Sequence, residues 1–220
     1  MKFNTIEEAL EQYKQGKMIV VVDDEDRENE GDFVIAGELA TAQDINFMAK
    51  EGRGLVCVPI AREIATRLSL TPMVQQNTAI HETAFTVSVD AVNKTTTGIS
   101  ANDRWETLKV LADPKSEFTD LARPGHMFPL IAKEGGVLQR AGHTEAAVDL
   151  SILCGLKPVS LLVEIVDGDG TMARGDRLHE IAQNFKFPII TIADLINYRR
   201  HHEKLVVELS CIPFPTDHGD

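Results

Sequence analysis

Residues 18–36 read MIVVVDDEDRENEGDFVIA, and this stretch decides the fold. The apolar runs 18–22 and 33–36 have the length and the β-branched content of buried strands. Seven of the ten residues at 23–32 are carboxylates, and a glycine precedes the second run. Such a short polar segment is typical of a tight loop. The sequence therefore predicts two strands joined by an acidic loop.

The charge of this loop indicates a bound cation. Carboxylates that crowd at a strand end repel one another, and a divalent cation relieves the repulsion. Oxygen ligands favour a hard ion such as magnesium or manganese. A solvated acidic turn is the alternative interpretation, but loops held by strands often carry function. An EF-hand that begins at Asp26 is excluded, because it needs glutamate where the chain has Gly37.

The rest of the chain alternates between helix and strand patterns. Thr5 with Glu8 forms a capping box for a first helix, and Thr41 caps a second. Further helices are expected near 61–68, 102–112, 145–154, 175–185 and 193–203, and strands near 54–58, 85–89, 127–132, 160–166 and 188–192. This order predicts one α/β domain over residues 1–203. Its mixed sheet is covered by helices and includes antiparallel pairing at the acidic loop.

Composition limits the partners and the compartment. With 220 residues and a net charge of −12, the chain is not expected to bind nucleic acid or an anionic membrane. A small anionic substrate stays compatible, because local arginines decide its binding. Cys57, Cys154 and Cys211 are widely spaced, so neither a disulfide framework nor a zinc ribbon is indicated. The expected location is a reducing cytoplasm. No apolar run approaches the ~20 residues of a membrane span.

Two copies of the pattern R-x-G-H form a second candidate for chemistry. They are Arg123-Pro124-Gly125-His126 and Arg140-Ala141-Gly142-His143. Histidine binds metals or moves protons near neutral pH, and arginine pairs with phosphate or carboxylate. The second copy leads into a helix start, where free N–H groups favour an anion. Simple glycine turns with surface side chains are the alternative.

Two polar residues stand in apolar strands. Glu164 interrupts the run 160–166, and strand alternation places it on one face with Leu162 and Val166. It either reaches solvent at an edge or enters a site as a partly desolvated acid. Cys57 is interpreted as a core residue rather than as a nucleophile.

Taken together, these motifs resemble a known family. DEDRENEGD at 24–32, TGISANDR at 97–104, RPGH at 123–126 and RAGHTEA at 140–146 are similar to 3,4-dihydroxy-2-butanone-4-phosphate synthase of riboflavin biosynthesis. The resemblance implies conversion of ribulose 5-phosphate to 3,4-dihydroxy-2-butanone 4-phosphate and formate, with magnesium or manganese as the metal. It also implies a three-layer α/β/α sandwich with a mixed, twisted sheet, and a homodimer with the active site near the dimer interface.

The resemblance also assigns expected roles to residues. The metal ligands would be Glu28 and His143, and the catalytic residues would be His126, Glu164 and Asp32. The other acids of the loop, residues 23–26, would mainly shape it. The expected substrate contacts are Arg27, Glu28, Asp32, Arg140, Ala141, Gly142, His143, Thr144 and Glu164.

Three interpretations stay open at this stage. Residues 204–220 extend past the usual end of the family and are expected to be either a linker to a fused GTP cyclohydrolase II domain or a relic of one. The same site would also suit a metal-dependent binding domain without turnover. A metal-dependent sugar-phosphate isomerase, which stops at the enediolate, is the other enzymatic alternative. Only the synthase releases formate.

Overall fold

The computed structural model describes residues 2–204, 206 and 210 of the chain. The expected extension at 204–220 therefore lies almost wholly outside the described residues. Within the described part, none of the helices combines the length and the apolar character needed to cross a bilayer.

A mixed seven-stranded sheet runs through the molecule in the order β4-β5-β3-β6-β2-β1-β7. Its strands are β1 (Ile19–Val22), β2 (Gly31–Ala36), β3 (Cys57–Ile60), β4 (Val89–Ala91), β5 (Leu121–Ile131), β6 (Ser160–Glu164) and β7 (Ile189–Thr191). The pair β1/β2 is antiparallel, as the acidic loop predicted. The pairs β1/β7 and β3/β5 are parallel, so the sheet is mixed.

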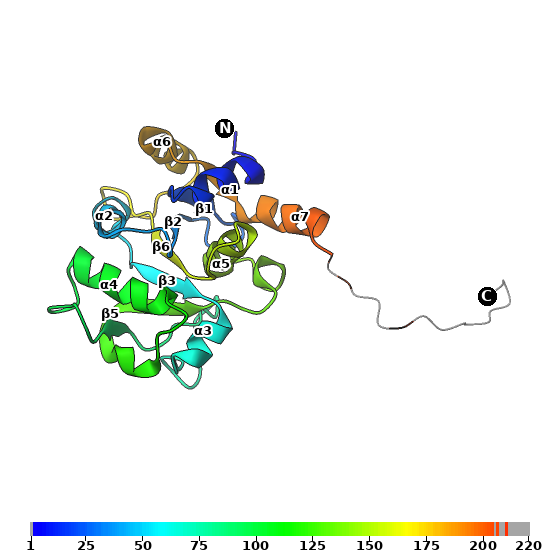
Figure 1. Ribbon diagram of the computed structural model, residues 1–220. Helices are drawn as coiled ribbons and strands as arrows, with labels where there is room; N and C mark the ends of the chain where they lie inside the picture. Colours follow the sequence, from blue (N-terminus) through cyan, green and yellow to red (C-terminus); the bar gives the residue numbers. More distant parts are fainter. Residues whose placement is uncertain (1, 205, 207–209, 211–220) are drawn as a thin grey trace.

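Helices cover both faces of the sheet (Figure 1). One face packs against α2 (Ala42–Phe47), α3 (Arg62–Arg67), α4 (Ala101–Ala112) and α6 (Asp176–Phe185). The other face packs against α1 (Ile6–Lys14), α5 (His143–Leu153) and α7 (Ile192–His202). Two apolar clusters, one on each side of the sheet, form the core. The three-layer α/β/α sandwich is thus confirmed.

Local capping explains where the first helices begin. The Thr5 side chain accepts from the Glu8 N–H at 3.2 Å, and Glu8 accepts from the Thr5 N–H in return. Thr41 forms the same box with Asp44. These reciprocal bonds satisfy N–H groups that have no partner inside the helix. Both predicted caps are confirmed. A π-helical turn, Met48–Gly52, continues α2 and was not predicted.

Two segments differ from their predicted structure. The strand expected at 85–89 contains only isolated bridges at Phe85 and Thr86, and the regular strand β4 begins at Val89. The strand expected near 127–132 begins earlier, at Leu121, so it includes the motif at 123–126, and the alternative of a simple glycine turn is wrong for this copy. A Cβ on Gly125 would lie 2.1 Å from the Val89 backbone, so this glycine permits the close packing of β5 against β4. Pairing between distant strands, which local patterns do not contain, decided both cases.

Strand register carries the site residues to one face. Asp32 is paired with Glu164 across β2 and β6. Side chains alternate along a strand, so Asp32 shares its face with Val34, which packs in the cluster of α1, α5 and α7. Both carboxylates therefore point to the layer that contains the start of α5.

Candidate active site

Asp23 organises the acidic loop. Its Oδ1 accepts from the Glu30 N–H at 2.9 Å, and its Oδ2 accepts from the Glu28 N–H at 3.2 Å. The Arg27 guanidinium donates to the same Oδ2 at 2.7 Å and lies 2.9 Å from Glu28 Oε2. Asp24 accepts from the Asp26 N–H. The loop-shaping role predicted for these first acids is consistent with this hydrogen bonding, and the result is a fixed position for Glu28.

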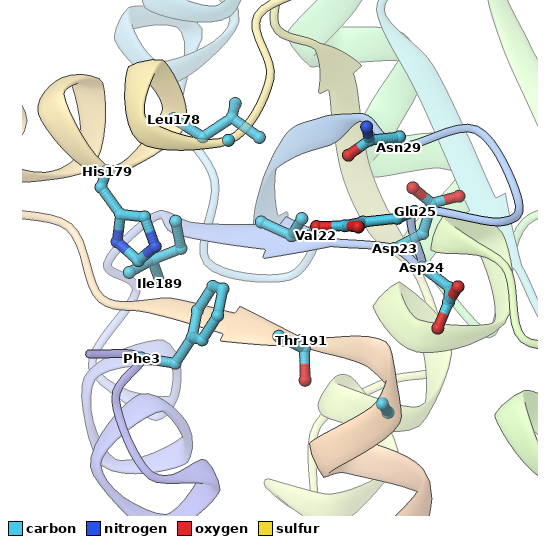
Figure 2. Close-up of a pocket in the computed structure, with 12 residues that line it drawn as sticks. Phe3, Val22, Asp23, Asp24, Glu25, Asn29, Leu178, His179, Ile189 and Thr191 are labelled. Carbon is cyan, nitrogen blue, oxygen red and sulfur yellow. The ribbon is translucent and has the colours of Figure 1, made fainter. Parts of the chain in front are cut away.

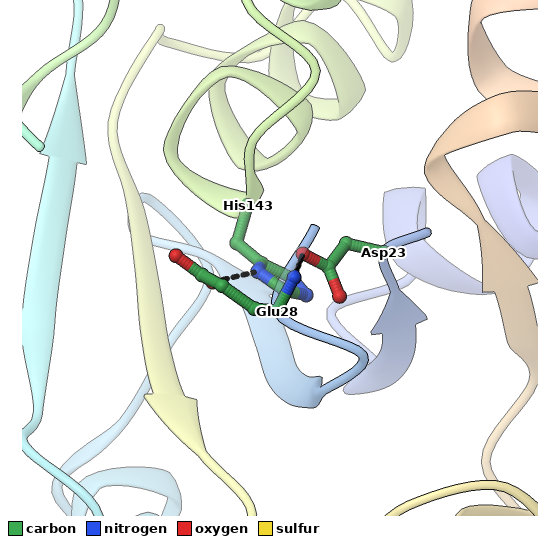
Figure 3. Close-up of side chains that lie close together, drawn as sticks. All are labelled: Asp23, Glu28 and His143. Atoms are coloured by element: carbon green, nitrogen blue, oxygen red, sulfur yellow. Dashed lines mark hydrogen bonds and ion pairs between the residues drawn. The ribbon is translucent and has the colours of Figure 1, made fainter. Parts of the chain in front are cut away.

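The first residue of α5 completes a compact group of polar side chains. His143 Nδ1 lies 3.7 Å from Glu28 Oε2 and 4.0 Å from Asp32 Oδ2. Figure 3 shows the three side chains close together, with Glu28 and Asp23 on opposite sides of His143. One ligand atom from each of Asp23, Glu28 and His143 lies within 4.8 Å of the others.

Glu164 lies at the carboxyl end of β6 and accepts from the Leu55 N–H at 2.8 Å. It is only partly buried. It lines the same hollow as Asp32, so of the two readings of this residue the structure supports entry into a site. The hollow encloses about 160 Å³. Its lining residues are Arg27, Glu28, Glu30, Asp32, Cys57, Thr83, Phe85, Leu130, Arg140, His143, Thr144, Leu162 and Glu164.

Burial and mutual charge set the protonation of the site. Burial, strengthened by the nearby carboxylates Glu164 and Glu28, raises the pKa of Asp32 to about 7, although His143 opposes this rise. Burial disfavours a charged His143, but Asp32 and Glu28 outweigh it and raise the pKa of the imidazole to about 9. The neighbouring His143 imidazole, together with Arg27, lowers the pKa of Glu28 to about 2 despite partial burial.

The residues present suit a divalent cation. His143 Nε2 and Asp32 Oδ1 are buried and have no hydrogen-bond partner among the described residues. A buried polar atom without a partner is unfavourable, and a bound cation would give both atoms a partner. Glu28 adds a carboxylate that stays ionised. Asp23 is the less suitable ligand of the group, because backbone N–H groups and Arg27 already occupy its oxygens.

Arg140 is held more firmly than the sequence suggested. Its guanidinium donates to Glu145, to the His81 carbonyl oxygen and to Thr83 Oγ1. Glu145 is 1% exposed and also accepts from the Lys133 N–H. No sequence motif predicted a role for Glu145 or Thr83. The features that could have indicated them are the polar stretch at 81–83 and the acid in the first turn of α5.

The glycine of the second R-x-G-H copy has a packing reason. A Cβ on Gly142 would lie 2.3 Å from Arg140 Nη1, so only glycine lets the guanidinium pass under the start of α5. Thr144 is buried and lines the hollow, whereas Ala141 is exposed and is not among the lining residues.

His126 lies outside this hollow. Its Nδ1 is 2.7 Å from Asp90 Oδ2, its N–H donates to Asp90 Oδ1, and its side chain is 42% exposed. The loop at Gly98 packs directly on this pair, since a Cβ there would meet both side chains. Arg123 donates to the carbonyl oxygens of Leu68 and Leu121 and so supports the fold. The structure brings together the other predicted catalytic and metal residues, but not His126.

Comparison with known proteins gives close matches over most of the chain. The family model of 3,4-dihydroxy-2-butanone 4-phosphate synthase matches residues 7–198. Riboflavin biosynthesis protein RibBA of Bacillus mycoides (strain KBAB4) is 60% identical over 217 residues, which cover 99% of this chain and 54% of that protein. The chain thus spans about half the length of the curated relatives it matches.

Two solved structures are similar over most of the chain. RibBX, a two-domain 3,4-dihydroxy-2-butanone 4-phosphate synthase from A. baumannii, has a TM-score of 0.91 and 45% identity, covering 98% of this chain and 64% of that one. A 3,4-dihydroxy-2-butanone 4-phosphate synthase in complex with two magnesium ions has a TM-score of 0.87 and 41% identity, covering 91% and 98%.

The fold and the site define a mixed α/β enzyme with a candidate centre for a divalent cation. The family model and the similar proteins all point to one family. The chain belongs to the 3,4-dihydroxy-2-butanone 4-phosphate synthase family of riboflavin biosynthesis.

Proposed function

We propose that this chain converts ribulose 5-phosphate to 3,4-dihydroxy-2-butanone 4-phosphate and formate. The single observation that supports this best is the group of Glu28, Asp32, His143 and Glu164 in one hollow, from three distant parts of the chain. The reaction divides the atoms of its substrate between two products and adds none. It therefore needs proton transfers at successive carbons and a rigid hold on neighbouring oxygens, which such a group supplies.

Asp32 and Glu164 are the residues best suited to move protons. Asp32 is buried and has a pKa of about 7, so it accepts or donates a proton near neutral pH. Glu164 faces the same hollow from the paired position on the next strand. Two carboxyl groups in different surroundings allow one to act as base in enolisation and the other as acid when a hydroxyl leaves.

Glu28 and His143 would hold magnesium or manganese. When bound, the cation would polarise the carbonyl and hydroxyl oxygens of the sugar and stabilise the charge that develops on enolisation. Arg27 fixes Glu28 through their ion pair, so it positions the ligand without binding the cation itself.

A wider hollow of about 460 Å³ opens beside the carboxylates and suits the substrate's phosphate. Arg27, Lys133 and Arg140 line it and give it positive charge. Arginine and lysine pair with phosphate through charge-assisted hydrogen bonds. Because Arg140 also binds Glu145 and the loop at 81–83, phosphate binding would involve the same guanidinium that holds this loop.

A homodimer is part of the proposal. His126 is expected to be catalytic, yet it lies outside the hollow and is exposed beside Asp90. In a dimer, His126 from a second copy would complete the site. The free thiols Cys57 and Cys154 are compatible with a reducing cytoplasm as the compartment. The dimer and the compartment both rest on the family resemblance. Sedimentation and the mixing of inactive variants test the dimer.

Formate release tests the reaction. Purified protein with ribulose 5-phosphate and magnesium should release one formate for each sugar consumed. A sugar-phosphate isomerase would consume the sugar without formate, and a binding domain would do neither. Mixing His126→Ala with Glu164→Gln should restore part of the activity if each hollow uses residues of two chains.

A further inference from the structure

A separate cavity lies behind the acidic loop. It encloses about 230 Å³ and shares no lining residue with either of the two hollows described above. It opens where the parallel strands β1 and β7 end. The carboxyl ends of neighbouring parallel strands are a common place for ligands in α/β proteins. Because one water occupies about 30 Å³, a cavity of about 230 Å³ has the room of several waters, which is the size of a single ring with a small substituent.

One end of the cavity is aromatic and apolar. The rings of Phe3 and His179 lie 4.7 Å apart, and Leu178 and Ile189 border them (Figure 2). His179 is only 8% exposed, and its ring makes no hydrogen bond to any described residue. Its ring lines the cavity and is available to a ligand.

The other end of the cavity is acidic. Figure 2 shows Asp24 and Glu25 across the cavity from Phe3 and His179, with Val22 and Thr191 between them. Neither Asp24 nor Glu25 forms an ion pair with a lysine or arginine of the described chain. Their charges are exposed, whereas Asp23 uses its oxygens within the loop.

We propose that this cavity is a second binding site, for a small aromatic cation such as an aryl amidine or aryl amine. The ring would stack against Phe3 and His179, and the cationic group would pair with Asp24 and Glu25. Anionic ligands are disfavoured by these carboxylates and by the net charge of −12.

The second site shares the acidic loop with the candidate metal centre. Asp23 borders the cavity and also holds the Glu28 backbone N–H. A ligand that shifts residues 23–25 would therefore shift the Glu28 backbone through Asp23, and cation binding at Glu28 would act on the same loop in return. Such coupling is reciprocal, so each ligand should change the affinity of the other by the same factor.

Benzamidine is a suitable probe, and benzamide is its neutral match in size and shape. Chemical shifts of the protein, followed by NMR, should titrate with benzamidine with a dissociation constant of about 1 mM or below. Benzamide should bind at least about tenfold more weakly. The double variant Asp24→Asn with Glu25→Gln should lose the same preference for the charged probe.

Blocking the cavity provides a test that does not depend on turnover. Ala193 lines the cavity from an exposed position, so Ala193→Phe should fill its mouth and abolish benzamidine binding. Gln183→Phe is the control, because Gln183 is exposed on α6 and borders none of these hollows. Saturating benzamidine should also change the dissociation constant of Mn²⁺ by about threefold or more in the parent protein and not in Ala193→Phe.

Three results would overturn the inference. Equal binding of benzamide and benzamidine would remove the cationic specificity, and unchanged binding in Ala193→Phe would place the probe elsewhere. An unaltered Mn²⁺ affinity would remove the coupling. None of these measurements uses ribulose 5-phosphate, so failure of the proposed reaction would be seen separately.

Discussion

Asp32 offers the sharpest test of the electrostatics of the site. The residue is 3% exposed, and within the part of the chain that the structure describes its Oδ1 has no hydrogen-bond partner. Its pKa rises from 3.8 to about 7, chiefly through burial. Each unit of pKa difference between the folded and unfolded chain corresponds to about 1.4 kcal/mol, so ionised Asp32 destabilises the metal-free fold by about 4 kcal/mol.

The sign of the pH dependence follows from these two pKa values. Below about pH 4 the carboxyl is protonated in both states, so it has no effect on the free energy of unfolding. Between about pH 4 and 7 the unfolded chain releases a proton that the folded chain retains, and stability falls as pH rises. Above about pH 7 the full penalty is present.

Asp32→Asn removes this penalty, since the amide has nearly the same shape and no charge. In EDTA at about pH 8, the variant should be more stable than the parent by up to about 4 kcal/mol, and the difference should shrink towards pH 4. Formate release should fall by ~10²-fold or more. Urea unfolding followed by circular dichroism measures the first effect, and Glu63→Gln, at an exposed acid on α3, is the control.

Lower stability of Asp32→Asn at about pH 8 would refute this reasoning. A gain that does not change with pH would do the same, because it would come from packing and not from a buried charge.

Four further predictions concern the other residues of the site. Glu28→Gln and His143→Ala should each weaken Mn²⁺ binding by more than about 100-fold, while circular dichroism shows an intact fold. A smaller loss, up to about 100-fold, is typical of residues that only support a metal ligand. Because the pKa of His143 is about 9, cation binding near pH 7.5 should release about one proton, and the affinity for the cation should fall as pH falls. Calorimetry in buffers of different ionisation enthalpy measures this proton release. Glu164→Gln should lower kcat by ~10²-fold or more and leave calorimetric binding of ribulose 5-phosphate nearly unchanged. Arg140→Ala should lower kcat/KM for ribulose 5-phosphate far more than for ribulose.

Each of these predictions has a result that contradicts it. Normal Mn²⁺ affinity in Glu28→Gln would move the metal centre elsewhere. Absence of proton release would mean that His143 is neutral before the cation binds. Weak substrate binding with normal turnover in Glu164→Gln would make Glu164 a binding residue, and proton transfer would then fall to His126 or Asp32. Comparable kcat/KM for the two sugars would contradict the phosphate site.

The sequence alone determined the elements whose signals are local. The apolar runs on either side of residues 23–32 predicted β1, β2 and their antiparallel pairing, because so short a loop can only join neighbouring strands. Thr5 and Thr41 fixed two helix starts through bonds that span three residues. The specific motifs at 24–32 and 140–146 indicated the family before any geometry was known.

Only the tertiary structure decided which distant residues meet. Strand register sets Asp32 opposite Glu164, and the packing of α5 brings His143 to Glu28. The same long-range packing takes His126 out of the hollow and opens a cavity behind the acidic loop. The buried charge of Asp32 is also a product of packing, because desolvation depends on every neighbour at once. A local sequence pattern identifies the chemical groups. The whole fold sets the distances between these groups and their exposure to water.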